Sequence, residues 1–187
     1  MQLYALCDQA LLDSHAMSVE EFVSIANKND AKILQYRNKT SDITFIKQQL
    51  IIIRQLFDGF LIVNDKYELI EYCDGVHLGQ EDLKQIDEDI FKAVNILRDI
   101  IKDDKLLGIS THNKKEVLEA NKMDLNYIGL GAYRDTNTKD NILNILGDEI
   151  ENIASISKHP VGVIGGVKLE DNFVNIIYKV IGSDLLK

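Results

Sequence analysis

Short apolar runs alternate with segments of helical periodicity along almost the whole chain. In the clearest repeat, apolar runs at residues 60–63 and 75–78 are each too short for a helix, and residues 66–73 between them mix charged and apolar side chains at helical spacing. This pattern predicts a strand, a helix and a second strand. Repetition of such a unit favours parallel strands with right-handed crossovers, so it predicts an α/β fold.

The alternation continues to the end of the chain. Strands are expected at residues 3–7, 31–37, 60–63, 75–78, 106–110, 127–130, 161–164 and 176–181. Helices are expected at residues 20–27, 42–57, 66–73, 83–103 (with the best pattern at 88–102), 114–121, 148–158 and 170–174, with a long polar loop at 131–146. Ser18 and Glu21 match a capping box at the start of the first helix. We therefore predict a (β/α)8 TIM barrel with a shortened C-terminal strand-helix unit.

An open, doubly wound sheet is the alternative architecture. Such a sheet is expected to carry a glycine-rich phosphate turn after its first strand. The chain has Cys7, Asp8, Gln9 and Ala10 at that place instead, which favours the barrel.

Length and charge limit the class of protein. The chain of 187 residues has no linker-like stretch, so we predict a single domain, residues 1–187. Its net charge of −9 argues against a nucleic-acid or anionic-membrane partner. No apolar run reaches the length of a membrane span, and the start, MQLYALCDQA, lacks a basic region followed by a long apolar one. A soluble, cytoplasmic protein is expected, with Cys7 and Cys73 as buried thiols.

Two aspartates follow neighbouring strands of the expected sheet. Asp65 comes directly after the run 60–63 and Asn64, and Asp82 follows the run 75–78. An Asp after a strand is more often a helix N-cap or turn residue than a metal ligand. Parallel strands would bring both carboxylates to one edge, however, and Mg2+ takes one or two protein carboxylates and completes its shell with water and phosphate oxygens. The pairing therefore predicts Mg2+ and a phosphorylated substrate.

Polar side chains also end the other strands. Gln35, Arg37 and Lys39 alternate along one strand and would project together as an anion site. Lys39 could equally be a solvated charge at a strand end. Gly165 and Gly166 either let backbone amides approach a ligand or form a tight turn.

Two histidines lie beside these strand ends. We assign neither a catalytic role, because His77 could be a satisfied histidine of the barrel and His112 could cap the next helix.

Six motifs together resemble the thiamine phosphate synthase family and its paralogue, the thiazole tautomerase. They are Gln35-x-Arg37-x-Lys39, LIVND at 61–65, DGVHLGQED at 74–82, GISTH at 108–112, TNTK at 136–139 and IGG at 164–166. They occur in the family's order and spacing over nearly the whole chain. The resemblance implies a barrel in which Mg2+, a pyrimidine diphosphate and a thiazole phosphate share the strand mouth.

The resemblance also implies roles for individual residues. Asp65 and Asp82 would bind Mg2+, while Arg37, Lys39, Asn64 and Lys139 would hold the diphosphate. Gln35 and Ser110 would face the aminopyrimidine, and Thr136, Thr138, the amide of Gly166 and Ser183 would take the thiazole phosphate. Arg37, Lys39, Lys139 and Ser110 would assist the reaction. In that reaction the thiazole nitrogen attacks the pyrimidine methylene as diphosphate leaves, giving thiamine phosphate with no protein nucleophile.

The chain departs from the family at two places. Residues 132–135 replace an apolar, proline-containing stretch, and the C-terminus is short, so that Ser183 is matched only by accepting a deletion. The tautomerases typically lack the second metal aspartate and have a histidine at the place of Ala132, so Asp82 and Ala132 favour the synthase. A non-catalytic barrel that binds thiazole or thiamine phosphate is a further alternative. The sequence is compatible with a homo-oligomer but does not fix the oligomeric state.

Overall fold

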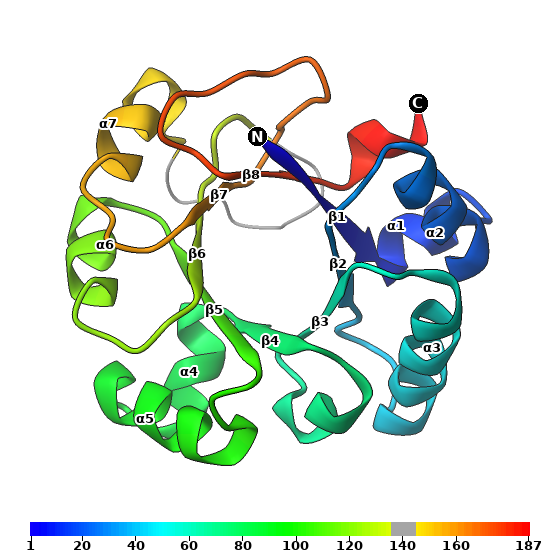
Figure 1. Cartoon of the computed structure of the whole chain (residues 1–187), viewed down its shortest axis with the longest axis horizontal. Helices are drawn as coiled ribbons and strands as arrows, with labels where there is room; N and C mark the ends of the chain where they lie inside the picture. Colours follow the sequence, from blue (N-terminus) through cyan, green and yellow to red (C-terminus); the bar gives the residue numbers. More distant parts are fainter. Residues whose placement is uncertain (136–144) are drawn as a thin grey trace.

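Eight parallel strands form a closed barrel in the order of the sequence, as the computed structural model of the chain shows (Figure 1). The structure describes residues 1–135 and 145–187. The strands are β1 (Gln2–Asp8), β2 (Ile33–Arg37), β3 (Phe60–Asn64), β4 (Gly75–Leu78), β5 (Leu106–Thr111), β6 (Tyr127–Leu130), β7 (Val161–Val163) and β8 (Tyr178–Ile181). The predicted TIM barrel is confirmed, and the open doubly wound sheet is wrong because β8 pairs with β1.

Helices surround the barrel on its outside (Figure 1). The α-helices are α1 (Gln9–Ser14), α2 (Val19–Lys28), α3 (Ile43–Leu56), α4 (Gln80–Ile86), α5 (Ile90–Ile101), α6 (Lys114–Ala120) and α7 (Ile150–Ala154). The 3-10 helices are η1 (Tyr67–Tyr72), η2 (Gly147–Glu149) and η3 (Ser183–Leu186). In the described part of the chain no helix is long and apolar enough to cross a membrane.

Side-chain caps fix where several helices begin. Ser18 and Glu21 form the predicted capping box, in which each side chain accepts a hydrogen bond from the other residue's backbone amide. Helices α3, α5 and α6 begin with a side-chain cap, in which the N-cap residue accepts a hydrogen bond from a backbone amide of the first turn. The N-cap residues are Asp42, Asp89 and Asn113, respectively. These caps satisfy backbone amides in the first turn of each of the four helices.

Two apolar layers follow from the alternation of side chains along the strands. Leu3, Ala5 and Cys7 of β1 face outward into the large core between barrel and helices. Tyr4 and Leu6 face inward and pack in a second, smaller cluster. The other buried members of this inner cluster are Ile33, Ile62, Tyr127 and Val180. The barrel interior is therefore a packed core, and a ligand must bind at one end of it.

The structure differs from the sequence prediction in several connections. The segment expected as a helix at 66–73 is the 3-10 helix η1, because few residues separate β3 from β4. The helix expected at 148–158 is only the short α7, preceded by η2. The pattern expected as one helix at 83–103 is two helices, α4 and α5, and helix α1 was not expected from the sequence. Cys7 and Cys73 are buried, as predicted.

The helix expected at 170–174 is absent, and this stretch is an irregular connection between β7 and β8. The Asp171 carboxylate accepts a hydrogen bond from the Lys168 amide at 2.8 Å, which closes a local turn. Asn175 has a φ of 61°, in the left-handed region that does not continue a right-handed helix. The local polar bonds therefore override the helical spacing of the apolar residues.

Candidate active site

Lys39, Asp65 and Asp82 come together at the carboxyl ends of β2, β3 and β4. The Lys39 ammonium group forms an ion pair with Asp65 and lies 3.4 Å from Oδ2 of Asp82. Asp65 directly follows β3, and its backbone amide donates to the His77 carbonyl of β4 at 2.9 Å. Asp82 lies in the first turn of α4. The register of three neighbouring strands thus brings two carboxylates to one cation.

The charge at this place is set by burial and by the pair of carboxylates. The Asp65 side chain is 10% exposed. Burial raises the pKa of Asp65 above its ordinary value and the negative charge of Asp82 adds to the rise, whereas the hydrogen bond from Lys39 opposes it. Two carboxylates that converge on a positive group fit a divalent cation of the Mg2+ type, which needs only one or two protein carboxylates. Among the described residues no third acidic, histidine or cysteine side chain joins them as a metal cluster.

A line of hydrogen bonds runs inward from Asp65. Asn64 Nδ2 donates to Asp65 Oδ2 at 2.5 Å, and Gln35 Nε2 donates to Asn64 Oδ1 at 2.7 Å. The Tyr4 hydroxyl donates to Gln35 Oε1 at 2.6 Å and lies 3.0 Å from the Tyr127 hydroxyl. Gln35 and Asn64, both predicted site residues, are therefore held by one another and by Tyr4.

The same line continues to Ser110 through His77. His77 Nδ1 lies 3.1 Å from the Tyr127 hydroxyl, and His77 Nε2 lies 3.0 Å from Ser110 Oγ. A hydroxyl has one proton, and that of Tyr4 goes to Gln35, so Tyr127 donates to Tyr4 and His77 Nδ1 donates to Tyr127. When His77 is neutral, its Nε2 accepts a hydrogen bond from the Ser110 hydroxyl, and the oxygen lone pairs of Ser110 are then available to a ligand.

Arg37 is paired with Asp8, a residue whose part in the site the sequence reasoning missed. The Arg37 guanidinium forms an ion pair with the Asp8 carboxylate, which is almost fully buried at the end of β1. Asp8 also caps α1, accepting the Leu11 amide at 3.2 Å. The signal was available, because Asp8 follows the strand predicted at residues 3–7, just as Asp65 closely follows the strand predicted at 60–63. Arg37 is thereby oriented at the same barrel end as Lys39.

The other predicted site residues follow β6, β7 and β8 in the sequence. Gly166 follows β7 and Ser183 follows β8, so both lie at the same end of the barrel as Asp65. Thr136, Thr138 and Lys139 lie outside the described residues. His112 Nδ1 lies 2.9 Å from a carboxylate oxygen of Glu116 in α6, and its place outside the site stays a prediction from the sequence.

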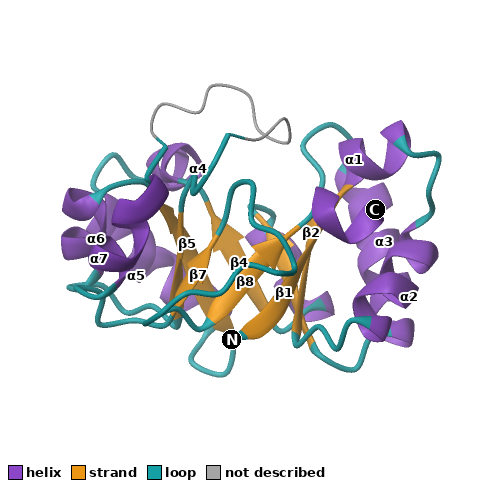
Figure 2. Ribbon diagram, turned by 90° about the horizontal axis from the view of Figure 1, so that it is seen from above, coloured by secondary structure: helices purple, strands orange, loops and turns teal. Residues whose placement is uncertain are grey.

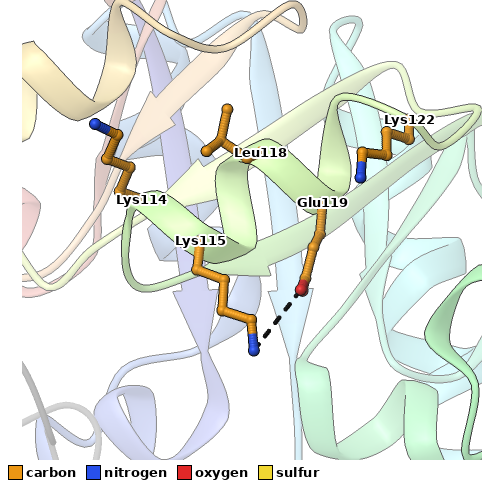
Figure 3. Close-up of a pocket in the computed structure, with 5 residues that line it drawn as sticks. All are labelled: Lys114, Lys115, Leu118, Glu119 and Lys122. Atoms are coloured by element: carbon orange, nitrogen blue, oxygen red, sulfur yellow. Dashed lines mark ion pairs between the residues drawn. The ribbon is translucent and has the colours of Figure 1, made fainter.

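The hollow drawn in Figure 3 lies on the outside of α6, away from the strand ends. Lys114, Lys115, Leu118, Glu119 and Lys122 line it. The Lys115 side chain is 84% exposed and lies 3.8 Å from Glu119. A hollow formed by one short helix with solvated charges has none of the convergent groups found at the strand ends.

The comparisons with known proteins agree on one family. The sequence model described as "Thiamine monophosphate synthase" matches residues 3–178. The thiamine-phosphate synthase of Caldicellulosiruptor bescii is 35% identical over 170 residues, which cover 88% of this chain and 73% of the relative. That of Persephonella marina is 29% identical over 182 residues, which cover 95% and 81%.

Solved structures give the same result. The thiamine phosphate pyrophosphorylase of Pyrococcus furiosus superposes with a TM-score of 0.74 at 26% identity, covering 96% of this chain and 85% of the other. A tryptophan synthase alpha-subunit from the same organism has a TM-score of 0.66 at 11% identity, covering 98% and 87%, and shares the fold alone.

Proposed function

The chain belongs to the thiamine monophosphate synthase family and acts as a thiamine-phosphate synthase; on this premise we propose that it joins hydroxymethylpyrimidine diphosphate to hydroxyethylthiazole phosphate with Mg2+ held by Asp65 and Asp82. The products are thiamine phosphate and diphosphate. One observation carries the residue assignment: two carboxylates from neighbouring strands converge on the Lys39 ammonium group at the barrel mouth. This arrangement gathers the charges that a metal-bound diphosphate requires.

Lys39 and Arg37 are the cations of the diphosphate subsite. Without substrate each is paired with a carboxylate, Lys39 with Asp65 and Arg37 with Asp8. When Mg2+ is bound it would neutralise negative charge that develops on the departing diphosphate. Lys39 is then free to turn from Asp65 to a phosphate oxygen, and Arg37 can offer a second N–H to the same group. Asn64 donates from the position in which Gln35 holds it.

The pyrimidine subsite rests on Gln35 and Ser110. Both side chains are oriented by the hydrogen-bond line through Tyr4, Tyr127 and His77. Ser110 presents an acceptor to the amino group of the aminopyrimidine, and the polar ring is thereby held with its methylene towards the second substrate. Holding both reactants in line lowers the entropic part of the barrier.

The thiazole phosphate is assigned to the other side of the barrel mouth. The amide of Gly166 after β7 and the hydroxyl of Ser183 after β8 would bind its phosphate, with Thr136 and Thr138 from the β6 loop. Lys139 would reach the diphosphate from the same loop. These assignments follow from the family motifs and the positions of the strand ends.

A coupled assay with both substrates and Mg2+ tests this function. We expect diphosphate release that requires the thiazole phosphate, requires Mg2+ and is matched by formation of thiamine phosphate. Omission of each substrate in turn and addition of a chelator are the controls. Diphosphate release that is independent of the thiazole, or binding of thiazole phosphate without turnover, would contradict the proposal.

A further inference from the structure

The connection between β7 and β8 is held by side chains rather than by a helix. Residues 164–177 contain no helix. Three backbone groups of this connection are bound by side chains from elsewhere: Lys179 Nζ donates to the Leu169 carbonyl at 2.5 Å, the Leu169 amide donates to Asp184 at 3.0 Å, and the Val174 amide donates to Glu151 at 2.7 Å. The course of this connection therefore depends on individual polar contacts.

A further contact with this connection comes from Arg134 in the loop after β6. Its guanidinium makes a two-pronged pair with Asp171, at 2.6 Å from NH1 to Oδ2 and 2.9 Å from NH2 to Oδ1. The Asp171 side chain is only 12% exposed. Arg134 also stacks on the Tyr133 ring at 4.3 Å, and Tyr133 meets Phe173 edge to ring at 4.9 Å. Residues 133 and 134 thus fasten the β6 loop to the β7–β8 connection.

The same loop fixes the turn that holds Gly165 and Gly166. The Tyr133 amide donates to the Ile164 carbonyl at 2.9 Å, and the Arg134 amide donates to the Gly165 carbonyl at 2.9 Å. Arg134 NH1 donates to the Gly166 carbonyl at 3.1 Å. Three consecutive carbonyl groups therefore point towards the loop after β6.

These three hydrogen bonds use the carbonyl groups of the turn and leave its backbone amides available to a ligand. In a planar trans peptide the N–H points opposite to the C=O, so the amides of Gly166 and Val167 point away from the loop. No described residue accepts a hydrogen bond from either amide. Gly165 and Gly166 have positive φ angles of 90° and 63°, which favour glycine. A Cβ added to Gly166 would lie 2.8 Å from the Arg134 Cβ. The turn is a close-fitting cradle whose donors face outward.

We propose that Arg134, held by Asp171, is a positioning residue for the phosphate monoester of the second substrate, which it orders by fixing the direction of the Gly166 and Val167 amides. The inference rests on the proposed function, because it assumes that these amides bind the thiazole phosphate. It gives a role to Arg134 of the loop after β6. Arg134 acts through the turn and does not touch the substrate.

Arg134→Gln and Asp171→Asn test the proposal, with Glu170→Gln as the matched control on the same connection. The Glu170 side chain is 71% exposed and its pair with Lys168 is 3.8 Å long. We expect Arg134→Gln and Asp171→Asn to raise KM for the thiazole phosphate about tenfold and to leave KM for the pyrimidine diphosphate within about twofold. The reason is that each substitution loosens the turn on the thiazole side of the barrel mouth and leaves the pyrimidine side unchanged. Arg134→Lys should not rescue, because an ammonium group cannot make the two-pronged pair.

The outcomes separate this inference from the proposed function. Turnover by the wild type tests the function alone. The affinity of the wild type and of the variants for inorganic phosphate, measured by calorimetry, tests the anion-binding turn at Gly165 and Gly166 and does not depend on turnover. Equal rises in both KM values, or unchanged KM and phosphate affinity in a variant with wild-type melting, would overturn the positioning role. If Arg134→Gln does not fold, Asp171→Asn decides, because its amide oxygen can still accept the Lys168 amide.

Discussion

Lys39 occupies the space between the two carboxylates that we propose as Mg2+ ligands. Its ammonium group pairs with Asp65 and lies 3.4 Å from Asp82. A buried carboxylate with a second one beside it is costly to leave without a positive partner. Lys39 therefore supplies the positive partner that these two carboxylates require, and its flexible side chain would allow it to turn to a phosphate oxygen if Mg2+ took that place.

Asp82→Ala is the sharpest test of the metal assignment. Asp82 lies in the first turn of α4 with 26% of its side chain exposed, so we expect the free energy of unfolding to change by no more than about 0.5 kcal/mol. Loss of one ligand should lower turnover in limiting Mg2+ by about a hundredfold, and excess Mg2+ should restore part of it. Glu81→Ala, the neighbouring exposed acid of α4, is the control. Wild-type turnover of Asp82→Ala in limiting Mg2+ would leave Asp82 as a turn residue only.

Tyr127→Phe tests the hydrogen-bond line that joins Asp65 to Ser110. The substitution leaves the Tyr4 hydroxyl and His77 without their shared buried partner, so we expect a loss of about 1–3 kcal/mol in the free energy of unfolding, measured by urea denaturation. KM for the pyrimidine diphosphate should rise as well, because Ser110 loses its fixed orientation.

Tyr178→Phe is the matched control for that variant. The Tyr178 ring packs against the same tyrosines, with centroids 6.3 Å from Tyr4 and 6.4 Å from Tyr127, and no described residue hydrogen-bonds its hydroxyl. Equal losses of stability in Tyr127→Phe and Tyr178→Phe would mean that ring packing, and not the hydrogen-bond line, matters here.

At the scale of elements, the β7–β8 connection shows how a polar pair replaces a helix. Arg134 lowers the pKa of Asp171 through its hydrogen bonds, with a smaller contribution from the Lys168 amide, against the opposing effect of partial burial. A carboxyl whose folded pKa lies below its unfolded value stabilises the fold above the unfolded pKa, and this contribution is lost as the pH falls through the folded pKa. The pair is therefore a stabilising contact at neutral pH that acid removes.

Asp171→Asn should show this pH dependence directly. At pH 7 we expect the free energy of unfolding of the variant to be about 0.5–1 kcal/mol lower than that of the wild type. The difference is small because solvent reaches part of the Arg134 side chain. The difference should begin to shrink as the pH falls below about 4, where Asp171 of the unfolded chain becomes neutral, and it should be lost as the pH falls through the lower pKa of Asp171 in the folded protein. Urea titrations at a series of pH values measure it, and a difference that does not depend on pH would contradict the ion-pair explanation.

The sequence predicted the strands better than the connections. Apolar runs mark strands whatever the surroundings, and all eight expected runs became strands of the barrel. Helix α1, and α4 as a separate helix, were not predicted because both are short. Each buries a single residue, Leu12 in α1 and Leu83 in α4, so neither shows a helical periodicity of apolar residues. The helix predicted at 170–174 was wrong for two reasons: Asp171 closes a local turn with the Lys168 amide, and Asp171 also pairs with Arg134, which is distant in the sequence.

The site divides in the same way. Topology alone brings Asp65, Asp82 and Lys39 to one barrel end, so strand order was enough to gather them. Tyr4 and Tyr127 belong to the inner core by their apolar rings, and only the three-dimensional structure shows that their hydroxyl groups connect Gln35 to His77. Their polar role has no signature in the sequence.

At the scale of the whole molecule, the two proposed subsites lie on opposite sides of one barrel mouth. Strands β2, β3 and β4 carry the residues proposed for the diphosphate and the metal, and β7 and β8 precede the residues proposed for the thiazole phosphate. Closure by β8 depends on four paired residues with β1 but only two with β7. The cytoplasmic location and a homo-oligomeric state stay predictions from the sequence.

Ligand binding across β2, β3 and β4 should therefore stabilise the whole barrel. A ligand that binds only the folded state at about 100 times its Kd adds about 2.7 kcal/mol, which for a chain of this size raises Tm by roughly 5–10 °C. We expect this rise, followed by calorimetry, with Mg2+ and diphosphate together and a much smaller one with either alone, because Asp65 and Asp82 need the cation before Lys39 can leave them. Lys115→Gln on the outside of α6 should respond as wild type, and Asp82→Ala should lose the combined effect. An equal rise with diphosphate alone would show that Lys39 and Arg37 bind it without a metal, and the proposed Mg2+ site would then be wrong.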